Sequence, residues 1–403
     1  MASENVRSIC FECHSRCGVI LEVRDGRLSR VRGDRGHPHS RGYTCPKGRA
    51  APEIIYHPER ITSPLVKVGP RSGTRFEETT WDEALDIIAA RLSEAKRRWG
   101  PESVVLGTGT TRGLAPYLNR FLTLFGSPNF MAPSNMSGGP VVLGSASTCG
   151  FGLVDPDYAE TSCMLLWAHN PEASWPGLYM NDIRNGLGRG ARLIVVDPRP
   201  TRLAGKAHHW LRIRPGTDTA LALCLINVII ERGLHDTDFV ERWTSGFDAL
   251  ARHVAPYTPA RTSDICWVDK DAITAAAEAF GSSKPACIGA GMGGVCQAND
   301  AFDLTRALTI LSAITGNLDV RGGNLDCTPP TRKRSCYGPE YCAYTNLPRE
   351  QAQKKLGLDR FPLIGFIPIP CPPQVVWEAV ETGRPYPVKA MGLFANNSVC
   401  AYP

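Results

Sequence analysis

The chain has 403 residues, of which 43% are hydrophobic and 21% charged, and its formal net charge is +6. This composition is typical of a globular protein, and the length exceeds what one hydrophobic core usually organises, so we expect more than one domain. No apolar run approaches the roughly 20 residues that cross a bilayer, which argues against a direct membrane span. The first residues lack an apolar signal-peptide core, and the 15 scattered cysteines suit a reducing compartment, so we expect a cytoplasmic location.

The first 60 residues carry 11 Lys and Arg against 7 Asp and Glu. Because the arginines are dispersed and no set of aromatic residues accompanies them, a nucleic-acid partner is disfavoured. Apolar stretches over residues 19–23 and 28–31 flank Asp25-Gly26, a dipeptide typical of a two-residue hairpin turn. We therefore expect residues 1–62 to form a small β-rich module.

Four cysteines of this module have the spacing of a metal centre: Cys10, Cys13 and Cys17 lie close together, and Cys45 follows in a C-P-K-G run. Four thiolates brought together by two short loops can bind a 4Fe–4S cluster or a structural zinc ion. Zinc sites usually pair two CxxC motifs, whereas the second half here offers one cysteine. The spacing therefore favours the cluster, zinc remains the alternative, and disulfides are the weakest interpretation.

After residue 64 the pattern changes to alternating helices and strands, which predicts parallel sheets covered by helices on both faces. A capping box at Thr80 and Glu83 opens a helix that ends at Gly100-Pro101. Strands are expected over residues 104–108, 164–167, 193–196, 286–290 and 388–394, and further helices over 218–231, 272–280 and 301–314. Proline-rich residues 328–387 are expected to be irregular. The fold class is α/β: the module is followed by two doubly wound domains, with residues 136–324 inserted between 63–135 and 325–403.

Three loops occupy the positions where ligands bind in open α/β sheets, beyond the carboxyl ends of strands. They cover residues 169–174, 197–201 and 214–218, and each by itself is better explained by capping of a strand end. Arginine and helix N-termini bind phosphates, and a carboxylate can accept two hydrogen bonds from a guanine edge. The candidate cofactor-binding residues are Asn170, Glu172, Ser174, Asp197, Arg199, Thr201, Gly216 and Asp218.

In combination, the C-x2-C-x3-C…C-P-K-G, N-P-x-x-S, D-P-R-x-T, P-G-T-D-x-A-L and T-G-N-L motifs resemble the molybdopterin oxidoreductases of the dimethyl-sulfoxide-reductase type. The resemblance runs from about residue 8 to the end and is strongest to acetylene-hydratase-like members. It implies a 4Fe–4S cluster and two molybdopterin guanine dinucleotides around molybdenum or tungsten. Asp197, Arg199, Thr201 and Asp218 would then bind a guanine dinucleotide, with residues 170–174 beside them.

The resemblance also implies catalytic roles. Lys47 would lie between the cluster and a pterin, on the electron route. Counting along the family's metal-ligand loop places Ser137 on the metal, with Cys149 as the alternative, and Gly138 after it argues against a formate dehydrogenase. His14 stands where the hydratase has a catalytic Asp directly after the second cluster cysteine.

The expected function is that of the N-terminal portion of a molybdenum or tungsten catalytic subunit. Its metal would exchange an oxygen atom or a hydroxyl group with a small-molecule substrate, and electrons would pass through the 4Fe–4S cluster. The resemblance also implies an iron–sulfur partner subunit. A non-redox hydratase on the same scaffold is the second reading, and a truncated, inactive metal-binding fragment is the third. Members of the family continue through a C-terminal barrel-like domain that this sequence does not include.

Overall fold

The computed structural model describes residues 3–70, 73, 75–109, 114–152, 154–327, 347–365 and 370–401. Its contacts divide the chain into two compact units, each built from two stretches. The first unit combines Met1–Pro52 with Met136–Pro329, and the second combines Glu53–Asn135 with Pro330–Pro403. Units defined by contacts need not coincide with domains, so the domain borders expected from the sequence stay a prediction.

The first unit opens with a three-stranded antiparallel sheet of β1 (Ser3–Ile9), β2 (Gly18–Arg24) and β3 (Arg27–Gly33), in that spatial order. The two residues between β2 and β3, Asp25 and Gly26, have φ of 49° and 76°. Positive φ at both positions gives the turn a twist that matches the strands it joins. The predicted hairpin is confirmed. Two short helices follow, α1 (Pro46–Arg49) and α2 (Ala51–Ile55).

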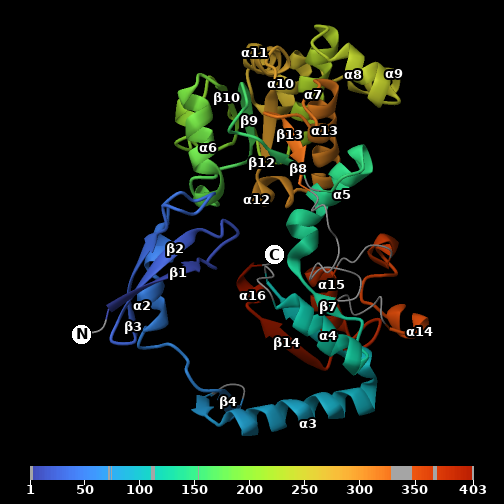
Figure 1. Ribbon diagram of the computed structural model, residues 1–403. Coiled ribbons are helices and arrows are strands. Elements are labelled where there is room, and N and C mark those ends of the chain that lie inside the picture. Colours follow the sequence, from blue (N-terminus) through green and yellow to red (C-terminus); the bar gives the residue numbers. More distant parts are fainter. Residues whose placement is uncertain are drawn as a thin grey trace. The chain divides into compact units, whose positions relative to one another are not determined.

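The centre of the first unit is a fully parallel sheet with strand order β11 (His209–Leu211), β10 (Arg192–Val196), β9 (Cys163–Trp167), β12 (Ala286–Ala290). Alternate residues of β9 point to opposite faces: Leu165 packs into one hydrophobic cluster, and Met164 and Leu166 into another. Helix α6 (Pro176–Gly188) covers one face, and α7 (Asp218–Glu231), α11 (Lys270–Gly281) and α13 (Ala301–Ile314) cover the other (Figure 1). The expected doubly wound α/β arrangement is confirmed.

Shorter elements complete this unit. β8 (Val154–Pro156) pairs antiparallel with β13 (Asn324–Asp326). The remaining helices are α5 (Gly138–Cys149), η4 (Ala204–Lys206), α8 (Thr237–Trp243), α9 (Phe247–Val254), α10 (Pro259–Cys266) and α12 (Met292–Val295). Helices α8, α9 and α10 were not predicted from the sequence, because their 7 or 8 residues each are fewer than the roughly 11 over which helical periodicity is recognised.

The second unit contains a parallel sheet of order β14 (Ala390–Phe394), β6 (Val104–Thr108), β7 (Phe130–Met131). β6 and β14 come from different stretches of the unit, and both were predicted. Helix α3 (Trp81–Trp99) begins with the predicted capping box, in which the Glu83 amide donates to Thr80 Oγ1 at 3.2 Å. The other elements are β4 (Leu65–Val68), β5 (Arg75–Glu78), η2 (Pro101–Ser103), α4 (Ala115–Phe125), η3 (Pro133–Met136), α14 (Arg349–Ala352), η7 (Pro362–Gly365), α15 (Pro373–Thr382) and α16 (Ser398–Ala401).

The prediction of an irregular segment over residues 328–387 holds for much of its described part but is wrong at α15, and residues 328–346 and 366–369 lie outside the described residues. Helix α15 begins with Pro372 at its N-cap and Pro373 in its first turn. Proline is tolerated in the first turn because the N–H it lacks would have no partner there. Val375 and Val376 of α15 pack with Cys371 and Val105 in the core of this unit.

Across the described parts of both units, no helix combines the length and apolar character needed to span a bilayer.

Candidate cofactor and cluster sites

The four cysteines of the N-terminal module lie on two loops. The Cys10 amide donates to the Cys17 carbonyl at 2.8 Å and closes the first loop, while Cys45 is the N-cap of α1. A Cβ placed on Gly48 of α1 would lie 3.3 Å from Cys10 Sγ, so the second loop touches the first. Burial raises the pKa of Cys17 to about 11, and the neighbouring thiols of Cys13, Cys10 and Cys45 add to the shift. All four are free thiols in one neighbourhood.

Four thiols on two adjoining loops could hold an iron–sulfur cluster or a single zinc ion. Within the described part of the chain, no three His, Cys, Asp or Glu side chains are placed to hold one metal ion. A zinc ion at about 2.3 Å from each sulfur needs its four thiolates nearly in contact, whereas a 4Fe–4S cluster spreads its thiolates around a larger body. The thiols are close enough to influence one another electrostatically, and the preference for a cluster over zinc rests on their spacing in the sequence.

The cysteine loops rest on the start of α6. A Cβ on Gly177 would lie 2.2 Å from Cys17 Sγ, so only glycine fits at this contact. The Asn181 side-chain amide of α6 donates to the Ser40 carbonyl at 3.3 Å, and Arg41 pairs with Asp182 at 3.5 Å. Contacts along two turns of the helix therefore fix the module to the parallel sheet that α6 covers.

The structure places His14 and Lys47 at the edge of the cysteine loops. The exposed ring of His14 lies with its centroid 5.4 Å from that of Trp175, the N-cap residue of α6. Lys47 is exposed on α1, two residues after Cys45. Their catalytic roles stay predictions.

A cavity of about 580 Å³ opens at the carboxyl ends of β9, β10 and β12. It brings together four of the predicted cofactor-binding residues from two loops. These are Asn170, Ser174, Asp197 and Arg199.

Polar groups of this cavity are set for a ligand. Asn170 Oδ1 is buried without a hydrogen-bond partner, which leaves an acceptor to be satisfied. Asp197 is only 3% exposed, and its Oδ1 accepts from the Arg199 amide at 2.8 Å. The Arg199 guanidinium, 71% exposed, lies 3.6 Å from the same oxygen at the rim. Ser174 is exposed, and its hydroxyl donates to the Asn170 carbonyl at 3.0 Å.

The third wall of the cavity was missed by the sequence analysis. It is the loop Gly291-Met292-Gly293-Gly294 after β12. A Cβ on Gly294 would lie 2.3 Å from the Ala168 Cβ, whereas Gly293 has nothing within 4 Å. Three glycines directly after a strand were the available signal, because such loops let backbone approach a ligand closely.

Four predicted residues lie outside the lining of this cavity: Glu172, Thr201, Gly216 and Asp218. Thr201 Oγ1 accepts from the amide of Ala204, the first residue of η4, at 3.0 Å. Asp218 is buried at the start of α7 and accepts from Trp167 Nε1 at 2.8 Å. Burial raises the pKa of the Asp218 carboxyl. Gly216, with φ of 82°, forms the turn before that helix. Their cofactor-binding roles stay predictions.

The two candidate metal ligands lie at opposite ends of α5. The helix has 12 residues, so Ser137 at its N-cap and Cys149 at its end are separated by about 18 Å. Val141, in the first turn of α5, lines a cavity together with Met292 of the loop after β12. Cys149, at the other end of α5, lines a different cavity together with Ile310 of α13. The start of α5 is therefore nearer the cofactor edge of the sheet.

The side chains at the two ends of α5 also differ. Ser137 is exposed and its hydroxyl makes no capping hydrogen bond. The Cys149 thiol donates to the Ser145 carbonyl at 3.3 Å, and burial raises its pKa. Both observations favour Ser137 as the available ligand.

His169, the first polar residue after β9, was not predicted as a site residue. It is 8% exposed, and its Nδ1 lies 3.1 Å from the Tyr158 hydroxyl. Burial lowers its pKa to about 4, so the ring is neutral at physiological pH. It lines the cofactor cavity as an uncharged group.

These features define a class: an α/β protein with a four-cysteine module held against a doubly wound domain whose strand ends form a glycine-walled cavity. The family described as molybdopterin oxidoreductase matches residues 60–355, and its Fe4S4 domain matches residues 3–57. The chain belongs to the molybdopterin oxidoreductase family, as the sequence motifs indicated. The two matches support a 4Fe–4S cluster and a molybdopterin cofactor.

Individual relatives agree with this assignment. Acetylene hydratase of Syntrophotalea acetylenica is 32% identical over 428 residues, which cover 98% of this chain and 57% of that protein. The molybdopterin-containing subunit of a thiosulfate reductase from Salmonella typhimurium is 27% identical, covering 97% and 52% respectively. The solved structure of acetylene hydratase from Pelobacter acetylenicus superposes with a TM-score of 0.88 at 30% identity, covering 98% and 57%. The chain thus spans about half the length of the relatives it matches.

Proposed function

We propose that this chain is the N-terminal part of the catalytic subunit of a molybdenum or tungsten oxidoreductase with two molybdopterin guanine dinucleotides. The bound metal would exchange an oxygen atom or a hydroxyl group with a small-molecule substrate. One observation carries the proposal: the start of α6 touches both sites. Gly177 contacts Cys17 Sγ, and Trp175, two residues earlier, lines the cofactor cavity. A cluster on the thiols would therefore lie beside a cofactor in the cavity.

Residues of the cavity have separate tasks in this proposal. Asp197 would accept hydrogen bonds from a guanine edge, Arg199 would bind a phosphate, and Asn170 Oδ1 would accept from the ligand. The loops around the cavity would be shaped by Glu172, Ser174, Thr201, Gly216 and Asp218. The glycines of residues 291–294 admit the ligand to the backbone.

The cluster of the N-terminal module would be ligated by Cys10, Cys13, Cys17 and Cys45. Lys47 would place its ammonium group between the cluster and the pterin. Ser137 would bind the metal through its hydroxyl oxygen, a hard ligand suited to high-valent molybdenum or tungsten.

A non-redox hydratase is the second candidate, favoured by the similarity to acetylene hydratase over 98% of this chain. It requires an acid near the metal, and His14 would have to supply it. Histidine with an ordinary pKa can move protons near neutral pH. The hydratase proposal predicts turnover with no electron donor or acceptor present.

Reduction and reoxidation of the cluster separate the two candidates. The protein is reduced with dithionite under anaerobic conditions and mixed with an oxo-substrate such as a sulfoxide or an N-oxide. The redox proposal expects substrate to restore the visible absorbance of the oxidised cluster. Hydration of an alkyne without any change in the cluster spectrum would overturn it in favour of the hydratase.

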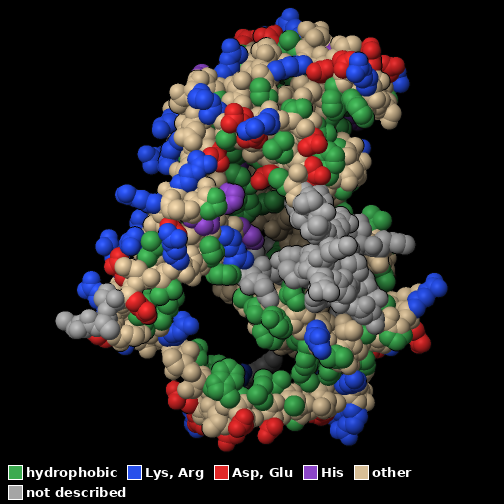
Figure 2. All heavy atoms as spheres, in the orientation of Figure 1, with side chains coloured by type: hydrophobic (Ala, Val, Ile, Leu, Met, Phe, Trp, Pro, Cys, Tyr) green, Lys and Arg blue, Asp and Glu red, His purple; other side chains and the backbone are tan. Residues whose placement is uncertain are grey.

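Electron transfer requires a partner, and we propose an iron–sulfur protein with an acidic docking face. Exposed Lys and Arg side chains spread over the β1–β3 sheet and α6 (Figure 2), among them Arg24, Arg27, Arg30 and Arg184. A positive surface steers an acidic partner to productive encounters. The 15 cysteines support a reducing, cytoplasmic compartment.

A further inference from the structure

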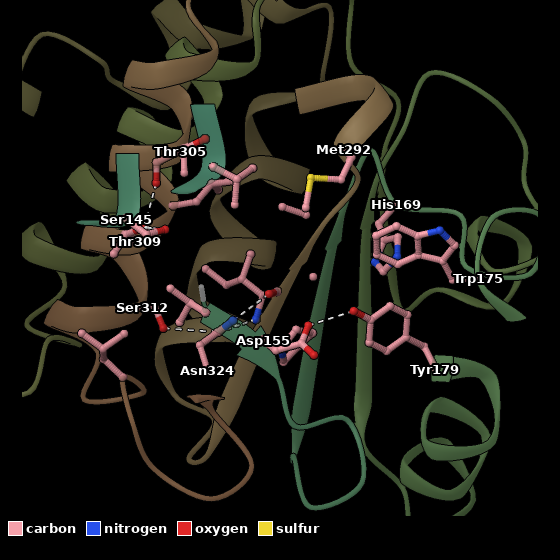
Figure 3. Close-up of a pocket in the computed structure, with 18 residues that line it drawn as sticks. Ser145, Asp155, His169, Trp175, Tyr179, Met292, Thr305, Thr309, Ser312 and Asn324 are labelled. Atoms are coloured by element: carbon pink, nitrogen blue, oxygen red, sulfur yellow. Dashed lines mark hydrogen bonds between the residues drawn. The ribbon is translucent and has the colours of Figure 1, made fainter. Parts of the chain in front are cut away.

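A second, smaller cavity of about 90 Å³ adjoins the cofactor cavity. It is enclosed by α5, β8, β12 and α13, and its labelled side chains face one another in Figure 3. His169, Trp175 and Met292 line both cavities. These shared side chains form the partition between the two cavities, so the cavities are direct neighbours.

The small cavity is polar enough to hold water. Its wall includes the hydroxyl and amide groups of Ser145, Thr305, Thr309, Ser312 and Asn324. A water molecule occupies about 30 Å³ of liquid, so the space accommodates about three. Because buried waters occupy sites with several polar partners, this cavity is expected to be hydrated, unlike an apolar void.

Asp155 of β8 is the carboxyl group of this cavity. Its Oδ1 accepts a hydrogen bond from the Tyr179 hydroxyl at 2.8 Å, drawn as a dashed line in Figure 3. Burial raises the pKa of Asp155, although this hydrogen bond opposes the shift.

The titratable groups around Asp155 supply no positive charge at neutral pH. His169 and Tyr179 share the cavity wall with it. Tyr158, Cys287 and Cys327 interact with it electrostatically. Burial keeps His169 uncharged, and the other four are neutral when protonated.

We propose that Asp155 stores a proton in this hydrated cavity and delivers it past His169 to the cofactor cavity. The inference rests on the proposed function, because redox turnover at a pterin-bound metal takes up or releases protons together with electrons. The step moves one proton: the carboxylic acid O–H breaks, cavity water accepts the proton and passes it on, and the carboxylate is reprotonated from solvent. No electron leaves or enters Asp155.

Redox-difference infrared spectroscopy on anaerobically purified, cofactor-loaded protein tests the proposal. Reduction with dithionite should change the carbonyl stretching band of a protonated carboxylic acid, and the band should shift in heavy water. Asp155→Asn should abolish this band. Asp326→Asn, which changes an exposed carboxyl on the paired strand β13, should leave it intact. A band that survives in Asp155→Asn would overturn the proposal.

Tyr179→Phe guards against a folding defect in the first variant. It retains the carboxyl group and removes its hydrogen-bond donor, so the band should persist at a changed frequency. In turnover at neutral pH, Asp155→Asn should be slower on the order of 10²-fold, with partial rescue by added acetate as a diffusible weak acid. An unshifted band in Tyr179→Phe, or slow turnover that acetate does not rescue, would contradict a proton-storing role.

Cofactor content separates this inference from the function on which it rests. Protein that contains the cluster and pterin but shows no Asp155-dependent band overturns the relay alone. Protein that binds no pterin overturns the relay and the proposed function together.

Discussion

His169 shows how burial alone sets the charge of a side chain. Its position after β9 is fixed by the sheet, and its hydrogen-bond neighbour is a tyrosine hydroxyl, which does not compensate a positive charge. The ring lines both cavities, and a fixed positive charge at that position would repel protons that move between them.

The first prediction follows from that burial. The pKa of His169 falls from 6.5 to about 4 on folding, so the unfolded chain binds the extra proton first as the pH drops. The contribution of His169 to the free energy of unfolding is fully present above pH 6.5 and is lost as the pH falls toward 4, a decrease of about 3 kcal/mol in total. Urea denaturation should show a smaller decrease for His169→Gln than for the wild type over this range. Identical pH dependence of the two proteins would contradict the buried, neutral ring.

The second prediction concerns Ser137 and Cys149. Ser137→Ala should lower turnover on the order of 10²-fold or more while iron content stays unchanged, because a lost ligand affects the metal and not the cluster. Cys149→Ser is the matched control at the other end of α5 and should keep activity. Full turnover in Ser137→Ala, or its loss in Cys149→Ser, would show that the metal lies elsewhere.

At this scale the sequence predicted residues whose chemistry is local. Asn170, Ser174, Asp197 and Arg199 directly follow apolar strands, and the structure brings them to one cavity. The glycine wall of residues 291–294 was missed because its fit depends on Ala168, more than 100 residues earlier in the sequence. Thr201 and Asp218 have motif positions but use their side chains in hydrogen bonds within the protein, Thr201 with the nearby Ala204 amide and Asp218 with Trp167 of β9.

At the scale of elements, α6 is the link between the two sites. Its first turn supports the cysteine loop, its outer surface binds residues 39–41, and its inner face packs on the sheet through Met180 and Ile183. A substitution at the start of α6 should therefore affect binding of the cluster, and a substitution at its end should not.

The third prediction uses two glycines of this helix. Gly177→Ala places a Cβ 2.2 Å from Cys17 Sγ and should lower the iron content of purified protein. Gly188→Ala, at the last position of α6, meets nothing within 4 Å and should retain the iron and stabilise the helix by roughly 0.5–1 kcal/mol. Equal iron content in both variants would contradict the close approach of helix and cysteine loop.

The predicted elements were reliable where one pattern dominated. Helices over residues 218–231 and 301–314 and the strand over 286–290 have the bounds the sequence indicated. α15 was missed because a proline pair looks like a loop until its position at a helix start is known. The short α8–α10 were missed because their burial comes from packing on α7, α11 and α13, which a local pattern does not reveal.

At the scale of the whole molecule, the chain spans about half of its relatives' length and carries an excess of positive charge, +6 in total. The sequence predicted the family and fold class because several specific motifs occur in one order. It did not predict which part of the chain the cysteine module packs against, since that contact rests on single glycines and polar pairs.

The fourth prediction tests the basic surface. If exposed arginines over β1–β3 and α6 steer an acidic iron–sulfur partner, the bimolecular rate of electron transfer should fall by roughly tenfold or more between about 0.05 M and about 0.5 M salt. Arg30→Glu on the exposed face of β3 should weaken this dependence. Arg252→Glu on α9 is a control of equal charge change and should behave like the wild type. A rate independent of salt would contradict an acidic partner at this surface.

The central claim is that the four thiols of the N-terminal module bind an iron–sulfur cluster next to a pterin cofactor. Metal and pterin analysis of anaerobically purified protein tests it most directly. We predict about four iron atoms per chain, molybdenum or tungsten, and pterin fluorescence after oxidation, with the iron lost in Cys17→Ser. Folded protein that is colourless and contains zinc or no metal would contradict the account.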